Sequence, residues 1–448
     1  MHAADPYYIP FARGSYPVRP GNRLHLLLDG APIFRRIGEA VERARHSVWM
    51  TVAFYTHAFQ FPGGRGGLFD VLDRAVDRGL DVRLLLWRPN PESYGYDRTF
   101  RGSADDFEFL RRRGSRCRIR WDRVPAAFCQ HQKNWLIDVG QPSETVFVGG
   151  ANLSAETLWR HDAYLEIAGP AATDVRHNFV QRWNEASERA EPDGSWACDP
   201  SDSLPFPTAL SQSTGTSTIQ IQRMLHPRRY TNGQASPGAP PFDVGGGERS
   251  ILDQYLEAID AARRTIYLEH QAIPIPEVAA RLGKALERGV AIVLLVPAEA
   301  EAHVLAARRD PAQRAPFDSL ARLGQHPNFL LAGLAERGEW GPRPKYVHAK
   351  LMTVDDCWAT VGSCNLHWFS LSGHSELNAS IWDAAVAREI RCRLFDAHLG
   401  VATAALDDVT ALRLYRTVAL ANRRRMLVGS GDWEGATYAL DTANYAVT

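Results

Sequence analysis

Apolar and polar positions follow two alternating periods along the first 90 residues. Strand-like apolar runs at residues 23–30, 47–55 and 80–87 are separated by amphipathic helical runs at residues 32–46 and 68–79. A β-α-β-α-β order of this kind predicts a mostly parallel sheet covered by helices.

The same order of elements restarts after residue 248. Helical patterns at residues 248–264 and 278–289 alternate with strand patterns at residues 265–273 and 290–297. A repeat of about 200 residues is far longer than a solenoid unit and predicts two similar α/β lobes. We expect their equivalent edges to meet about a pseudo-two-fold axis, with the active site between them.

Composition divides the chain into four expected segments. Residues 1–190 form the N-terminal lobe and residues 249–400 the C-terminal lobe. Residues 191–248 are rich in Pro, Ser, Thr and Gly and predict a connection with surface loops, in which residues 217–225 form a strand. Residues 401–448 contain one helix and a polar tail.

A duplicated motif occupies corresponding places in the two lobes. The first copy contains His131, Lys133, Asp138, Gly150 and Asn152, and the second contains His348, Lys350, Asp355, Ser363 and Asn365. Because side chains alternate faces along a strand, the His and Lys of each copy share a face. The Asp has the opposite parity, so we expect a structural role, bound to turn amides or to a neighbouring strand.

A reactive histidine needs a carboxylate that fixes its tautomer and supports its charge. Asp162 and Glu376 follow the two Asn residues at similar distances, and each begins a β-rich run. The duplication distinguishes these two acids from the other acidic residues of the chain.

Two His, two Lys and two Asn around one cavity suit a tetrahedral phosphate. Lysine and asparagine donors can hold its non-bridging oxygens, where charge accumulates in the transition state. One histidine can attack phosphorus while the other protonates the leaving oxygen and then deprotonates the acceptor. We expect no metal and no other cofactor, because the lysines supply the positive charge.

Charge and hydropathy exclude some classes of protein. The 51 Lys and Arg residues balance 51 Asp and Glu residues, so no nucleic-acid partner is expected. No run approaches the ~18 to 20 apolar residues that span a bilayer, and the N-terminus lacks a signal-like pattern. We therefore expect a soluble chain, with a cytoplasmic or an exported location both open. Six cysteines without metal-ligand spacing indicate reduced thiols.

From residue 23 to residue 400 the chain resembles the phospholipase D superfamily, whose mark is this duplicated motif. The segments that carry the resemblance include HQKNWLID, VFVGGANL, YVHAKLMTVDD and VGSCNL, and they look closest to eukaryotic-type phospholipases D. The resemblance implies two phospholipase D-like lobes, each with a mixed, mostly parallel sheet flanked by helices.

The resemblance also implies residue roles. His131 corresponds to the family's nucleophile, which forms a phosphohistidine intermediate, and His348 to its general acid. The acids are expected to pair crosswise, Glu376 with His131 and Asp162 with His348. The phosphate would be bound by both motif lysines, both motif asparagines and, from one side, a hydroxyl: Lys133, Lys350, Asn152, Asn365 and Ser363. Gly150 in place of a second serine limits the hydroxyl contact to one side.

The leading interpretation is a phospholipase D that cleaves the distal phosphodiester of phosphatidylcholine or phosphatidylethanolamine to phosphatidic acid, with possible transfer to alcohols. A cardiolipin-synthase-type phosphatidyltransferase is the alternative, against which the missing membrane helices count. A lipid-degrading antibacterial effector with the same chemistry is a further alternative, and a nuclease and an inactive lipid-binding protein are weaker ones. We expect a monomer that contacts the membrane surface transiently. Trp368 and Phe369 fit equally well in the core or at an entrance that touches acyl chains.

Overall fold

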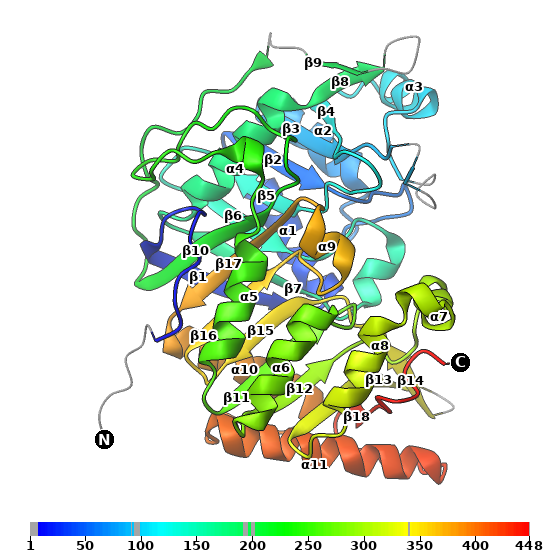
Figure 1. Cartoon of the computed structure of the whole chain (residues 1–448). Coiled ribbons are helices and arrows are strands. Elements are labelled where there is room, and N and C mark those ends of the chain that lie inside the picture. Colours follow the sequence, from blue (N-terminus) through cyan, green and yellow to red (C-terminus); the bar gives the residue numbers. More distant parts are fainter. Residues whose placement is uncertain are drawn as a thin grey trace.

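The computed structural model describes residues 8–90, 92–93, 99–190, 196–198, 202–338 and 341–447. It contains two halves that lie one above the other in Figure 1, the N-terminal half in blue to green and the C-terminal half in green to orange. The elements of the N-terminal half are β1 (Arg19–Leu28), α1 (Gly30–Arg43), β2 (Ser47–Val52), α2 (Leu68–Asp77), β3 (Asp81–Trp87), α3 (Ala104–Arg113), β4 (Arg118–Asp122), β5 (Lys133–Ile137), β6 (Thr145–Gly149), the 3-10 helix η1 (Ala155–Trp159), β7 (Ala163–Ala168), α4 (Ala172–Glu185), β8 (Ser187–Ala190) and β9 (Trp196–Cys198).

The chain then continues through a second set of elements. These are β10 (Ser217–Met224), η3 (Val244–Gly246), α5 (Ser250–Ala261), β11 (Thr265–His270), α6 (Pro276–Glu287), β12 (Ala291–Leu295), α7 (Ala302–Arg309), η4 (Pro311–Gln313), α8 (Ala315–Leu323), β13 (Phe329–Gly338), β14 (Gly341–Lys345), β15 (Lys350–Val354), β16 (Trp358–Gly362), α9 (Trp368–Ser372), β17 (Glu376–Trp382), α10 (Ala384–Leu399), α11 (Asp408–Leu427) and β18 (Thr437–Ala439).

Strand pairing is duplicated between the two halves. In the N-terminal half the order is β1-β7-β6-β5-β2-β3-β4. In the C-terminal half it is β10-β17-β16-β15-β11-β12-β13. Each strand of one series has a counterpart of the same direction in the other, and the start of β1 pairs with β10, which joins the two series. The fold is therefore the expected mixed α/β fold with two similar lobes.

The expectation that each sheet is mostly parallel is wrong. Parallel pairs occur only within β2-β3-β4 and β11-β12-β13 among the described strands. The motif strand and the two strands after it are antiparallel in both halves. Residues 138–144 join β5 to β6 and residues 355–357 join β15 to β16, and turns this short can join only antiparallel neighbours, whereas a parallel pair needs a longer crossover. The connection from each hairpin to its third strand is longer and contains η1 or α9. The helical crossovers of each half lie between its other strands.

The connecting segment contributes a central strand as well as loops. All eight residues of β10 are buried, and β10 pairs with β17 along seven positions. It occupies the place in the C-terminal half that β1 occupies in the N-terminal half. The domain boundaries at residues 190, 248 and 400 remain a prediction.

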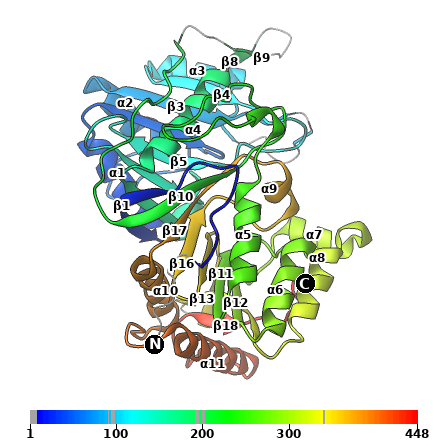
Figure 2. The same cartoon turned by 60° about the vertical axis from the view of Figure 1, so that its left-hand side comes forward.

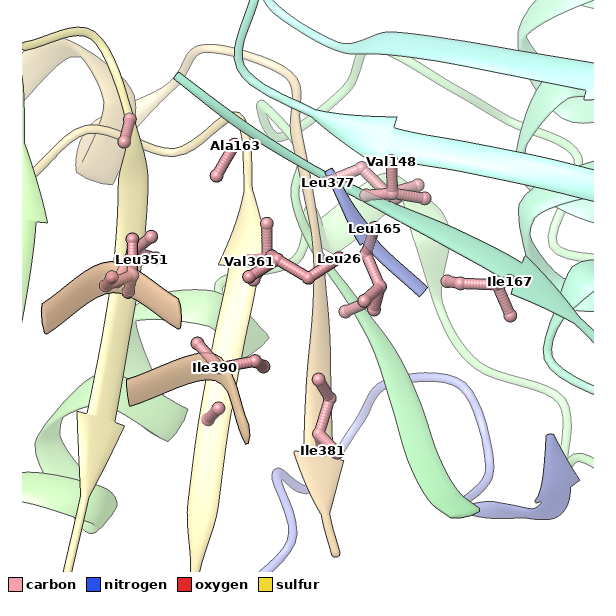
Figure 3. Packing of buried hydrophobic residues seen from close by; sticks show 14 of the residues in the cluster. Leu26, Val148, Ala163, Leu165, Ile167, Leu351, Val361, Leu377, Ile381 and Ile390 are labelled. Atoms are coloured by element: carbon pink, nitrogen blue, oxygen red, sulfur yellow. The ribbon is translucent and has the colours of Figure 1, made fainter. Parts of the chain in front are cut away.

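A shared hydrophobic core lies between the lobes. Leu165 and Val148 of the N-terminal half belong to the same cluster as Val361 and Leu377 of the C-terminal half (Figure 3). Neighbouring Phe147 belongs instead to the outer core of the N-terminal half, because alternate side chains on β6 point to opposite faces. Burial on both faces explains why β6 and β16 are apolar along most of their length.

Helices cover the outer faces. In α1, Ile33, Phe34, Ile37 and Val41 are buried at helical spacing and pack in the outer core of the N-terminal half. Helices α5 and α6 cover the corresponding face of the C-terminal half, and α10 lies on the other side of its strands (Figure 2). Within the described residues, no helix combines the length and apolar character required to cross a membrane.

Candidate active site

The two motif strands deliver a histidine and a lysine each to the junction between the lobes. His131 and His348 lie just before β5 and β15 and are buried, with 7% and 2% of their surface exposed. The Nζ atom of Lys133 donates to the backbone oxygen of His131 at 2.7 Å, and Lys350 donates in the same way to His348. Each lysine is therefore held beside its own histidine.

Backbone hydrogen bonds cross between the lobes on both sides of the site. His131 N donates to Ser375 O at 2.8 Å, directly before Glu376. His348 N donates to His161 O at 2.7 Å, directly before Asp162. The segment that carries each acid is thus attached to the motif of the opposite lobe.

These bridges bring each acid to the histidine of the other half. The Nδ1 atom of His131 lies 2.9 Å and 3.0 Å from the two carboxylate oxygens of Glu376. The Nδ1 atom of His348 lies 2.7 Å from Oδ2 of Asp162. Both acids are fully buried. A carboxylate that accepts from Nδ1–H leaves Nε2 of each ring for chemistry.

Two serines complete the surroundings of Glu376. Ser363 donates to Oε2 and Ser370 to Oε1, both at 2.6 Å. The donation to Glu376 uses the single hydroxyl proton of Ser363, and its oxygen also accepts from the backbone amide of Leu377 at 3.1 Å. In this geometry that proton goes to Glu376, and the contact of Ser363 with a phosphate stays a prediction. Nothing in the sequence pattern distinguished Ser370.

Asp162 has a different support, and Gly150 shows why. The Oδ1 atom of Asp162 accepts from the backbone amide of Ala163 at 2.8 Å. A Cβ atom on Gly150 would lie 2.8 Å from that Oδ1 atom and 2.9 Å from Cδ of Lys350. The glycine is therefore required for the close approach of Asp162 and Lys350 and leaves no room for the counterpart of Ser363.

The two motif asparagines have carbonyl oxygens without a hydrogen-bond partner within the described residues, although both atoms are buried. The Nδ2 atom of Asn365 lies 3.4 Å from Oε1 of Gln271, which also lies 3.4 Å from Nζ of Lys350. Buried polar atoms without a protein partner at such a site are suited to a ligand or to water. Gln271 lies outside both motifs and directly follows the strand β11, on which His270 pairs with Lys350, so the motif pattern did not predict it.

Burial and the lysine charges set the protonation of the site. Burial, and then Lys133 and Lys350, hold the pKa of His131 well below its usual range. Burial and Lys350 do the same to the pKa of His348. Burial lowers the pKa of Lys133 to about 8 and that of Lys350 to about 7. An anion among these groups would favour their charged forms.

Burial acts in the opposite direction on the two acids. It raises the pKa of Asp162 to about 6, against the nearby charge of Lys350. It also raises the pKa of Glu376, against the charge of Lys133. The site therefore disfavours every isolated charge, which is the condition under which a bound anionic substrate has the largest effect.

The aspartates of the motif hold backbone amides. Asp138 accepts from the amides of residues 45, 46 and 47 at 2.8, 2.8 and 3.4 Å. Asp355 accepts from the amides of residues 263, 264 and 265 at 2.8, 2.8 and 2.7 Å. Both aspartates have positive φ angles, 52° and 53°. They join the turn after each motif strand to the start of β2 or β11.

Aromatic side chains lie beside the site without entering the core. Trp368 and Phe369 of α9 are 57% and 45% exposed, which excludes core packing for both. Phe128, three residues before His131, has its ring centre 5.6 Å from that of Trp368. In the N-terminal half, Trp159 of η1 lies seven residues after Asn152 and is 77% exposed.

Neighbouring histidines and thiols contribute to structure. His374 accepts from the backbone of Cys129 at 2.9 Å, and His367 caps α9 by accepting from Ser370 N at 3.2 Å. Cys129 and Cys364 are buried, and burial raises the pKa of both thiols well above the usual value. Neither thiol has the environment of a reactive thiolate.

Similarities to known proteins agree with this geometry. Residues 255–398 match the family described as "Cardiolipin synthase, PLD-like domain". Over 384 residues the chain is 23% identical to cardiolipin synthase 1 of Staphylococcus epidermidis (strain ATCC 12228 / FDA PCI 1200), covering 83% of this chain and 66% of that protein. It is also 23% identical over 491 residues to phospholipase D A of Dictyostelium discoideum, covering 86% of this chain and 36% of that protein.

The fold has a solved counterpart. The crystal structure of phosphatidylserine synthase from Haemophilus influenzae Rd KW20 superposes with a TM-score of 0.57 and 14% identity, covering 90% of this chain and 94% of that one. Together these similarities support the phospholipase D superfamily for this chain. They do not single out the eukaryotic-type enzymes.

Proposed function

We propose that the protein is a phosphatidyltransferase of the cardiolipin synthase type, which moves a phosphatidyl group from one glycerophospholipid to the hydroxyl group of another. The observation that carries the proposal is the pair of buried histidines, each held at Nδ1 by a carboxylate from the opposite lobe. The sequence motifs alone favour hydrolysis of the phospholipid over phosphatidyl transfer. The similarity to cardiolipin synthases favours transfer, with water as the competing acceptor.

The reaction runs in two displacements at phosphorus. Nε2 of His131 attacks, the bond from phosphorus to the headgroup oxygen breaks, and His348 gives its proton to that oxygen. The neutral His348 then takes the proton of the acceptor hydroxyl as its oxygen attacks phosphorus. The phosphorus–nitrogen bond breaks, and His131 is restored.

The lysines and asparagines would bind the transferred phosphate. Lys133 and Lys350 come from opposite lobes and can neutralise the non-bridging oxygens, which gain charge in the transition state. Asn152 and Asn365 can complete the contacts. Neither step needs a charge beyond those that these side chains and the two histidines supply.

Exposed aromatic residues support transient contact with a membrane surface. Trp159 lies seven residues after Asn152 and Trp368 lies three residues after Asn365, and both are more than half exposed. Aromatic side chains are favoured at the boundary between lipid headgroups and acyl chains. A lipid substrate that remains largely in the bilayer could reach the site past Trp368, whose ring lies beside that of Phe128.

Product analysis on phosphatidylglycerol vesicles tests the proposal. Transfer to a second phosphatidylglycerol releases glycerol and forms cardiolipin, whereas hydrolysis releases glycerol and forms phosphatidic acid. We expect cardiolipin, and ethanol in the mixture should divert part of it to phosphatidylethanol. His131→Asn is the control and should abolish every product. Phosphatidic acid alone, with no phosphatidylethanol, would contradict transfer.

A further inference from the structure

A chain of charged groups crosses between the lobes behind the His348 half of the site. Nδ1 of His161 lies 2.8 Å from Oδ1 of Asp29, and Nε2 of His161 lies 2.7 Å from Oε2 of Glu269. Nζ of Lys345 donates to Oδ2 of Asp29 at 2.9 Å. His161 and Asp29 belong to the N-terminal half, and Glu269 and Lys345 to the C-terminal half.

This arrangement requires a charged imidazole. Both ring nitrogens of His161 face a carboxylate oxygen at hydrogen-bond distance, so both must carry a proton. Although burial opposes the charge, Glu269 and Asp29 raise the pKa of His161 to about 10. The side chain of His161 is 3% exposed and that of Glu269 is fully buried. Water therefore screens the pair with Glu269 very little.

His398 lies beside this chain, and its proximity also raises the question of a metal site. Donor atoms of His161, Glu269 and His398 lie within 4.8 Å of one another. Two ligands of one tetrahedral zinc ion would be roughly 3.3 Å apart, given bonds of about 2.0 Å. The 2.7 Å between His161 and Glu269 is instead the length of a direct charged hydrogen bond. Tyr267 donates to the second oxygen of Glu269, also at 2.7 Å. Both carboxylate oxygens of Glu269 therefore have a hydrogen-bond donor.

The backbone of His161 is attached to the strand of the second motif. His161 N donates to Tyr346 O at 2.9 Å, and His161 O accepts from His348 N at 2.7 Å. The next residue, Asp162, binds the ring of His348. The side chain of His161 therefore fixes the segment that sets both the backbone and the ring of His348.

At the corresponding place in the other half of the site, a serine stands where His161 makes its charged link. Ser375 takes the place of His161 there, bridging to the backbone of residues 129 and 131. Its hydroxyl accepts from Nε2 of Gln132 at 2.9 Å, a neutral contact. Among the described residues, the charged link at this position joins the two lobes behind His348, whereas the corresponding contact of Ser375 behind His131 is neutral.

We propose that His161 is a positioning residue for the proton donor, acting through Asp162 and His348 by way of its ionic link across the lobes. This inference rests on the proposed function, in which His348 protonates the leaving headgroup. It assigns the link to one chemical step and not to the attack by His131.

Two leaving groups separate that step from general damage to the site. Phosphatidylglycerol releases an alkoxide that needs a proton, whereas phosphatidyl-p-nitrophenol releases a stabilised phenolate that needs none. For His161→Gln we expect kcat for phosphatidylglycerol to fall by about 30-fold or more, which is part of the roughly 10²- to 10⁴-fold that general acid catalysis contributes. Formation of p-nitrophenol in a single turnover should change by less than about threefold.

Ser375→Ala is the matched control, because Ser375 holds the equivalent place behind the nucleophile. Its effect, whatever its size, should be the same for both substrates, since both need the attack by His131. Glu269→Gln tests the link from the other lobe and should show the same substrate dependence as His161→Gln. Glu269→Gln also serves if His161→Gln does not fold, as judged by its melting curve.

Equal losses on the two substrates for both His161→Gln and Glu269→Gln would overturn the inference and leave the proposed function intact. Unchanged activity on both substrates would overturn it as well. Absence of turnover of either lipid by the wild-type protein would instead contradict the proposed function.

Discussion

The two halves of the site share one backbone plan but support their acids differently. Glu376 is held by two serine hydroxyls, and Asp162 by a backbone amide and the neighbouring ionic link of His161. Gly150 makes room on one side where Ser363 donates on the other. The two histidines precede equivalent strands, but the residues around their carboxylates differ. This difference allows the two histidines to have different roles in the proposed reaction.

Removal of either histidine should have the largest effect and should distinguish the halves. His131→Ala should lower kcat by at least about 10³-fold on lipids with either a glycerol or a p-nitrophenol headgroup, since the nucleophile is lost. His348→Ala should be comparably slow on the glycerol lipid but keep much of the single-turnover release of p-nitrophenol. Stopped-flow absorbance measures that release. An equal loss of p-nitrophenol release in both variants would contradict the assignment of His131 as nucleophile and His348 as proton donor.

Exchange of the small residues next to the acids should have the next largest effect. Gly150→Ser places a side chain against Asp162 and Lys350, so we expect kcat to fall by about 100-fold or more. Ser363→Ala removes one hydrogen bond to Glu376, of about 1 to 3 kcal/mol, and should cost roughly tenfold. Steady-state assays of kcat check which variant loses more activity. A larger fall for Ser363→Ala than for Gly150→Ser would contradict this prediction.

Anion binding should weaken as pH rises. Burial lowers the pKa of Lys350 to about 7, so its charged, anion-binding form predominates below pH 7 in the free protein and is lost above it. The affinity for sulfate, which stays dianionic, should fall by up to about tenfold per pH unit from pH 7 to pH 8. Calorimetric titration measures this, and Lys350→Met should show a flatter profile. Affinity that rises with pH would contradict the assignment.

Loss of an exposed aromatic residue should have the smallest effect. Trp368→Ala should weaken binding to phosphatidylglycerol vesicles by a few fold, about 1 kcal/mol, because the ring no longer inserts at the interface. Turnover of a short-chain substrate below its micellar concentration should not change. Vesicle co-sedimentation checks the first result. Trp159→Ala offers the comparison on the other half, and unchanged binding in both variants would exclude this contact surface.

The repeat of strand and helix patterns was enough to predict a mixed fold with two similar lobes. Parity along the motif strand also placed Asp138 and Asp355 away from the histidines, where they accept backbone amides. The prediction of a mostly parallel sheet was wrong, because the parallel pairing that helical crossovers produce at the start of each half was extended to the later strands, which pair antiparallel. The sequence did not decide whether Trp368 lies in the core or at an exposed entrance, since the apolar character of a side chain does not reveal whether it faces the core or the solvent.

What the sequence determined by itself is local: the period of each element, the shared face of His131 and Lys133, and the presence of two copies. Only the tertiary structure decided the partners, because His131 and Glu376 are 245 positions apart and His348 and Asp162 are 186 apart. Contacts at such separations depend on how the two lobes dock through their common core. The same docking of the lobes brings His161 to Glu269, and the fold of the C-terminal half directs the Ser363 hydroxyl to Glu376. Neither contact can be read from spacing along the chain.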